Sequence, residues 1–195
     1  MNTIRILVQG YAKILKAGWK ASSTCTLIRS NGLNIVVDPG TNKDLLGKAL
    51  KQEGLSFNKG VDIVVITHYH TDHFLNAGLF INSKVLDEEA VYQGDYAEEY
   101  DNNTIPGTDI KIIKTPGHTL NQISLVVETK KYGTVVIAQD VFWWMEDEEQ
   151  KVDIDKKDEF AESHEKLVSS RRKVLEIADW IIPGHGKMFQ NTQKA

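Results

Sequence analysis

Four side chains that can bind a metal ion lie within six residues of one another, in Thr67-His68-Tyr69-His70-Thr71-Asp72-His73. The segment follows the apolar run 61–67. In an extended chain alternate residues face the same way, so His68 and His70 can point to one side. Asp72 and His73 follow where the chain must leave the sheet. A single histidine is usually a surface or core residue, but this spacing at the end of a strand indicates a metal site.

Three further candidate ligands have the same local setting. His118 follows a predicted strand over 110–114, Asp140 follows one over 134–138, and His185 follows one over 180–182. Glycine precedes both His118 and His185, and it permits tight turns and close approach of the backbone. Strands that end at a common edge would bring these side chains to the 68–73 segment.

The types of ligand restrict the metal. Imidazole nitrogens and carboxylate oxygens suit zinc, iron or manganese. The chain has one cysteine, Cys25, which excludes a thiolate-rich site and an internal disulfide. Cys25 lies in an apolar run and is expected to be a small packed residue.

The elements that must position these side chains are mostly short strands. Apolar runs predict strands over 4–8, 24–28, 34–37, 61–67, 110–114, 123–129, 134–138 and 180–182. Asn31-Gly32 predicts a hairpin turn between the second and third of these. Periodic leucines predict a short helix over 44–54, and apolar spacing predicts a long helix over 158–179. Many strands with few helices are typical of an α+β or layered α/β fold.

Length and composition are those of an ordinary globular protein. The chain has 195 residues and a formal net charge of −4. This charge argues against broad nucleic-acid binding. We see no signal peptide and no apolar run long enough to cross a membrane, so we expect a cytoplasmic protein with no membrane partner. We expect a single domain over residues 1–195, and no pattern specifies an oligomeric state.

The metal-binding residues resemble the motifs of the metallo-β-lactamase superfamily. His68-Tyr69-His70-Thr71-Asp72-His73 matches its H-x-H-x-D-H motif, and His118, Asp140 and His185 match the later ligands in order. Val37-Asp38-Pro39-Gly40 matches an early V-D-x-G element. The resemblance implies an αββα sandwich, in which two mixed sheets pack face to face between outer helices and the metal site lies along one edge.

The resemblance also implies a role for each residue. His68, His70 and His118 would hold one metal ion; Asp72, His73 and His185 would hold a second; Asp140 would bridge the two. The expected cofactors are two divalent ions, zinc first, with manganese or iron as alternatives. A hydroxide that bridges them would cleave an ester, thioester, lactone or phosphodiester bond, with Asp72 as the catalytic residue that orients it. Asp38 would accept a hydrogen bond from a ligand imidazole and fix its tautomer.

Several functions remain open within this resemblance. The chain is similar to short single-domain hydrolases, and one branch of these contains a nuclease, so an endoribonuclease acting on single-stranded RNA is an alternative that the net charge does not support. A mononuclear iron persulfide dioxygenase and a non-catalytic metal-stabilised scaffold are two others. The positive charges of two metal ions would exceed the negative charges of the nearby carboxylates and the hydroxide, so the site would be positive. The expected partner is therefore a small-molecule or anionic substrate.

Two other segments have alternative interpretations. Trp143 and Trp144 follow Asp140 closely and would either line a substrate pocket or pack in the core. The run Arg171-Arg172-Lys173 is expected to form a charged helix face rather than a phosphate site.

Overall fold

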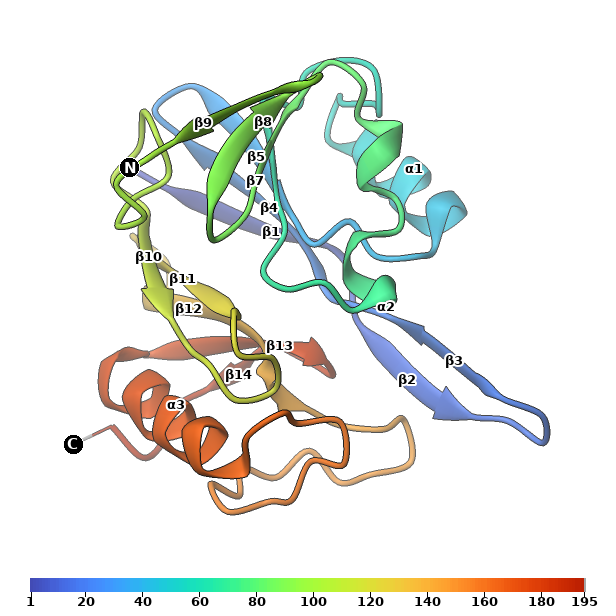
Figure 1. Ribbon diagram of the computed structural model, residues 1–195, viewed down its shortest axis with the longest axis vertical. Coiled ribbons are helices and arrows are strands. Elements are labelled where there is room, and N and C mark those ends of the chain that lie inside the picture. Colours follow the sequence, from blue (N-terminus) through green and yellow to red (C-terminus); the bar gives the residue numbers. More distant parts are fainter. Residues whose placement is uncertain (195) are drawn as a thin grey trace.

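Two mixed β-sheets face each other in the computed structural model, which describes residues 1–194 (Figure 1). The first sheet has the order β1-β4-β5-β6-β7-β8-β9, with bounds Thr3–Val8, Cys25–Ser30, Leu33–Val37, Ile63–Val65, Lys84–Leu86, Ala90–Gln93 and Tyr96–Glu99. The second has the order β10-β11-β12-β13-β14, with bounds Lys111–Lys114, Ile123–Thr129, Gly133–Trp143, Trp180–His185 and Phe189–Gln190. β5, β6 and β7 run parallel to one another, as do β12 and β13.

Side-chain alternation along the strands divides the core into layers. In β5, Ile35 and Val37 are buried between the sheets, whereas Val36 packs on the outer face with α1 (Lys43–Gln52). In β12, Ile137 faces the other sheet and Val136 faces α3 (His164–Ile177). This period of two residues is that of a strand covered on both faces. The layers are helix, sheet, sheet and helix, so the predicted αββα sandwich is confirmed.

The predicted hairpin between the second and third strands is also confirmed. β4 pairs with β5 in an antiparallel ladder that ends at Ser30 and Leu33. Asn31 and Gly32 have φ values of 49° and 84°. Both central residues are therefore in the left-handed region that a type I′ turn requires.

The predicted long helix is wrong at its N-terminal end. α3 begins at His164, and residues 158–163 form turns instead. Ser163 caps the helix, because its side-chain oxygen accepts a hydrogen bond from the backbone N–H of Lys166. The backbone N–H of Ser163 also donates to the carbonyl of Gly117 at 2.9 Å. These contacts fix the backbone before residue 164 in a non-helical conformation, although Phe160 fits the apolar spacing of a helix.

Asp140 lies inside a strand rather than after one. β12 continues to Trp143, five residues beyond the predicted end at residue 138. The register against β13 shifts on both sides of Gln139, whose φ is 48°. This irregularity bends the strand immediately before Asp140, and such bulges often redirect a side chain.

A hairpin that the apolar pattern does not predict projects from the body of the molecule (Figure 1). It consists of β2 (Tyr11–Ile14) and β3 (Trp19–Ser22). Ile14 and Trp19 are 72% and 81% exposed at its far end.

Two short elements lie between β6 and β7, the helix α2 (Thr71–Phe74) and the 3₁₀ turn η1 (Ala77–Leu79). Within residues 1–194, no helix has the length and apolar character needed to cross a membrane.

Candidate metal centre

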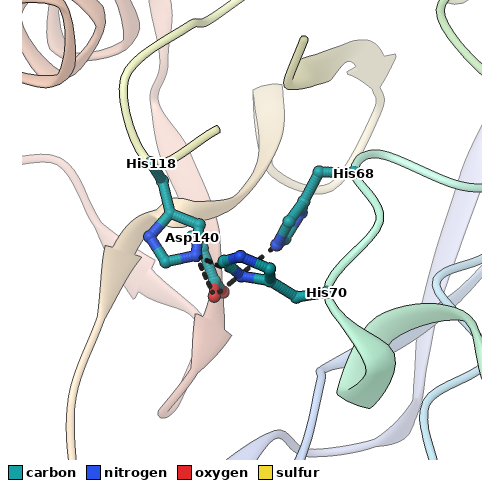
Figure 2. A group of neighbouring side chains, drawn as sticks. All are labelled: His68, His70, His118 and Asp140. Atoms are coloured by element: carbon teal, nitrogen blue, oxygen red, sulfur yellow. Dashed lines mark hydrogen bonds and ion pairs between the residues drawn. The ribbon is translucent and has the colours of Figure 1, made fainter. Parts of the chain in front are cut away.

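The seven predicted ligands meet at one edge of the sandwich. His68 and His70 lie in the loop after β6, and Asp72 and His73 lie in helix α2. His118 lies in the turn after β10, Asp140 lies inside β12, and His185 is the last residue of β13. Figure 2 shows the side chains of His68, His70, His118 and Asp140 directed at one another. The structure thus brings together every residue of the predicted set, while their role as metal ligands remains a prediction.

The candidate ligand atoms form three overlapping groups, of which two contain all seven predicted ligands and the third joins Asp38 to His68 and His73. The first group is His68, His70, His118 and Asp140, and the second is Asp72, His73 and His185. Within each group the candidate atoms lie within 4.8 Å of one another. Asp140 Oδ2 is 3.1 Å from His118 Nε2, and Asp140 Oδ1 is 3.2 Å from His73 Nε2. The carboxylate therefore faces both groups, as a bridging ligand would.

Asp38 holds the imidazoles of the 68–73 segment from behind. Its Oδ2 accepts hydrogen bonds from His73 Nδ1 at 2.8 Å and from the Thr67 hydroxyl at 2.6 Å. The Thr67 oxygen in turn lies 3.2 Å from His68 Nδ1. These contacts leave the Nε2 atoms of both histidines free to face the centre, and such outer partners fix the tautomer of a ligand. The hydrogen bond expected of Asp38 is present.

Two more imidazoles are held in the same way. His118 Nδ1 donates to Asp158 Oδ2 at 2.7 Å, and His185 Nδ1 donates to the carbonyl of Ser22 at 3.2 Å. Sequence reasoning missed Asp158, which is 40 positions from His118 and lies in a stretch rich in lysine and aspartate. No local signal distinguishes it from its neighbours, because only the fold brings it to His118.

Burial and charge make this cluster suitable for a cation. Burial by itself would raise the pKa of Asp140, but the imidazoles of His73, His185 and His118 lower that pKa well below its usual value. Burial, with His73 nearby, lowers the pKa of His68 well below its usual value. Burial would also lower the pKa of His73 and His118, but the Asp140 carboxylate raises the pKa of His73 well above its usual value and that of His118 to about 9. An anionic carboxylate thus lies among buried imidazoles and attracts positive charge, and His68 favours the neutral form that binds metal.

Unsatisfied buried atoms in the cluster also fit the binding of a cation. Among the residues that the structure describes, His68 Nε2, His73 Nε2 and Asp140 Oδ1 are buried without a hydrogen-bond partner of good geometry. Buried polar atoms are nearly always paired, so three such atoms at one point call for an explanation. Nitrogen and oxygen donors in this arrangement fit divalent zinc, manganese or iron.

The two adjacent tryptophans have different surroundings. Trp144 is buried and packs with Phe142 and Phe189 in the core under α3. The ring of Trp143 is 6.2 Å from that of His185 and 5.9 Å from that of Phe160, measured between centroids. Trp143 therefore borders the metal centre, whereas Trp144 does not.

The expectation for the basic run is wrong at Arg171. This side chain is buried, and it donates to the carbonyls of Val141, Ile154 and Lys156 at 3.0, 2.9 and 2.6 Å. It therefore ties the segment after β12 to helix α3 instead of facing solvent. A guanidinium can do this because its rigid fork presents several donors at once.

Gly184 provides a test of where Asp140 must lie. A Cβ at this position would overlap Asp140 Oδ1, whereas one at Gly78 would meet nothing within 4 Å. Gly184→Ala is expected to displace the carboxylate and weaken metal binding by about 10–100-fold, and Gly78→Ala to leave it unchanged. Competition with a chromophoric chelator measures the affinity, and thermal unfolding checks that both variants fold. Wild-type affinity in a folded Gly184→Ala protein would contradict the assignment of Asp140 as a ligand.

The fold and the cluster together define a class of protein, a metal-dependent hydrolase with an αββα sandwich. The family model for the metallo-beta-lactamase superfamily matches residues 18–98. A crystal structure of a metallo-beta-lactamase family protein from Thermus thermophilus superposes with a TM-score of 0.66 at 15% identity, over 97% of this chain and 75% of that one. The likeness at this identity concerns the fold.

Similarity to known sequences shows the family to which the chain belongs. It is 32% identical to metallo-beta-lactamase domain-containing protein 1 from Xenopus laevis, over 97% of this chain and 82% of that protein. The chain belongs to the metallo-β-lactamase superfamily, as its motifs predict. It is also 29% identical to an N-acyl homoserine lactonase from Bacillus, over 57% of this chain and 50% of that protein.

Proposed function

We propose that the cluster is a dinuclear metal centre that hydrolyses a carboxylic ester, with lactones as the substrate class to test first. The observation that carries the proposal is the position of Asp140, whose two oxygens lie 3.1 Å from His118 Nε2 and 3.2 Å from His73 Nε2. His68, His70 and His118 would hold one ion, and Asp72, His73 and His185 the other.

The metal ions would supply a water molecule of lowered pKa and would polarise the bond under attack. The side chains would supply position and proton transfer. Asp72 Oδ2 lies 3.1 Å from His185 Nε2, and its side chain is 25% exposed. Its other oxygen can accept the proton of the attacking water and return it to the leaving alkoxide. The carbonyl carbon gains a hydroxyl group and its bond to the leaving oxygen breaks.

The surroundings of the centre favour an ester with an apolar part. Phe160, which packs against Trp143, is 60% exposed, and Leu120, two residues after His118, is 50% exposed. Large apolar side chains exposed beside a polar centre are typical of a ligand-binding surface. The similarity to a lactonase also supports an acylated lactone. An alkyl thioester is the nearest competing substrate.

Removal of metal is expected to abolish hydrolysis. The purified protein would be assayed on N-hexanoyl homoserine lactone, an alkyl thioester and bis(p-nitrophenyl) phosphate, before and after dialysis against a chelator. Activity on the lactone is expected to disappear with the metal and to return with Zn²⁺ or Mn²⁺. A chelator-resistant activity would contradict the proposal. One iron per chain would favour the dioxygenase, and inertness on all substrates with both metals bound would favour the scaffold.

A specific observation favours a second candidate, cleavage of single-stranded RNA. The hairpin 11–22 carries Lys13, Lys16 and Lys20 with no acidic residue, beside the exposed Trp19. Its base adjoins the centre, since Ser22 accepts the hydrogen bond from His185. Basic and aromatic side chains together are what an unpaired strand requires.

The RNA candidate makes its own prediction. Binding of a fluorescent oligoribonucleotide is expected to weaken as salt rises, because phosphate contacts release counterions. Trp19→Ala is expected to weaken that binding by about tenfold, since stacking is worth about 1–3 kcal/mol per base. Tyr96→Ala, at an exposed aromatic position in the edge strand β9, is the control. Binding that is absent, or that does not respond to salt, would eliminate RNA as the substrate.

A further inference from the structure

Asp158 lies at a junction between the metal centre and the adjacent surface. Its side chain is 1% exposed although it belongs to an irregular segment between β12 and α3. Oδ2 accepts hydrogen bonds from His118 Nδ1 at 2.7 Å and from Trp143 Nε1 at 3.0 Å. Oδ1 accepts one from the backbone N–H of Phe160 at 2.9 Å. One carboxylate therefore contacts a candidate ligand, an aromatic side chain at the centre and the backbone beside it.

The segment that carries Asp158 is fixed on both sides. Before it, Arg171 binds the carbonyls of Ile154 and Lys156. After it, the backbone N–H of Glu162 donates to the carbonyl of His118 at 3.1 Å. A group can orient another side chain only if it is itself held in place. Asp158 meets this condition even though it lies in a loop.

The hydrogen bonds of Asp158 fix the orientation of the two side chains that donate them, His118 and Trp143. Because His118 Nδ1 is bound to Asp158, its Nε2 is the nitrogen that faces the centre, 3.1 Å from Asp140 Oδ2. Because Trp143 donates through Nε1, its ring is held between the rings of His185 and Phe160. Rotation of either ring would remove one of the two donors that Oδ2 has in this buried position.

We propose that Asp158 is a positioning residue with two effects: it aims His118 Nε2 at the metal, and it fixes Trp143 as the wall against which the apolar part of the substrate packs. The second effect rests on the proposed ester hydrolysis. The first concerns metal binding and stands without it.

Three substitutions separate these effects. Asp158→Asn keeps the shape but has one acceptor oxygen, which cannot serve His118, Trp143 and the Phe160 N–H as the carboxylate does. Trp143→Phe keeps an aromatic ring, although a smaller one, and removes the N–H donor. Asp155→Asn is the matched control, because this carboxylate lies three residues away and is 77% exposed.

Metal affinity and steady-state kinetics would be measured for the full chain. Asp158→Asn is expected to weaken Zn²⁺ binding by about 10–100-fold in a chelator competition. Trp143→Phe is expected to retain wild-type affinity but to raise KM for N-hexanoyl homoserine lactone about fivefold, with kcat changed less than twofold. Asp155→Asn is expected to match the wild type in both.

The outcomes are distinguishable. Zn²⁺ affinity of Asp158→Asn within twofold of wild type would overturn the positioning role, as would a loss that only parallels a fall in thermal stability. An unchanged KM in Trp143→Phe would overturn the role of the wall. If the wild-type protein cleaves no ester but Asp158→Asn still loses affinity, the proposed function fails and the positioning of His118 stands.

Discussion

Asp140→Asn is expected to lower turnover of the metal-saturated enzyme about a thousand-fold or more, with the protein still folded. The Asp140 carboxylate lies 3.1 Å from His118 Nε2 and 3.2 Å from His73 Nε2, through different oxygens. Asparagine has nearly the same shape, but one of its two terminal atoms is an amide nitrogen that donates hydrogen bonds and binds metal poorly. The substitution therefore removes the bridge and one negative charge while the packing is preserved.

Two controls make this result specific. Asp147→Asn, at an exposed position shortly after the same strand, is expected to retain full activity. Elemental analysis of Asp140→Asn would show whether metal is lost along with activity. Near-normal turnover in a metal-saturated Asp140→Asn enzyme would contradict the two-metal mechanism.

Asp38→Ala is expected to reduce the free energy of unfolding by about 3–5 kcal/mol, a large effect for one side chain. Asp38 is 0% exposed and accepts three hydrogen bonds, from the backbone N–H and hydroxyl of Thr67 and from His73 Nδ1. Alanine would leave these donors buried and unpaired. It would also occupy a backbone conformation with φ of 45°, which aspartate tolerates better than alanine.

Urea unfolding of the metal-free protein measures this change without any contribution from metal binding. Asp38→Asn is the informative partner, because it retains acceptor capacity and is expected to lose less stability than Asp38→Ala. A loss below about 1 kcal/mol in Asp38→Ala would show that Thr67 and His73 find other partners.

The central part of the fold could be predicted because its strands are strongly apolar and end in residues that break a sheet. Ile63 and Val65 face the other sheet while Val64 packs on the α1 side, so the strand is apolar on both faces. The chain changes to polar residues at His68, where it leaves the sheet. The candidate set does not depend on the exact end of a strand, and Asp140 lies beside His68, His70 and His118 although β12 extends past it.

The missed features depend on contacts between distant segments. Asp158 is recognisable only after folding brings it to His118, and Arg171 resembles a surface residue until its three backbone partners are known. The helix predicted from residue 158 fails for the same reason, since the contacts of Asp158 and Ser163 determine the backbone there. Local periodicity contains no information about such partners.

Metal titration of the metal-free protein tests the central claim most directly. Isothermal calorimetry with Zn²⁺ is expected to give two bound ions per chain, and a His73→Ala, His185→Ala double variant is expected to bind one, because it lacks imidazoles of the second group while His68, His70 and His118 remain. Binding of two ions by the double variant, or of fewer than two by the wild type, would contradict the assignment of this cluster as a dinuclear metal centre.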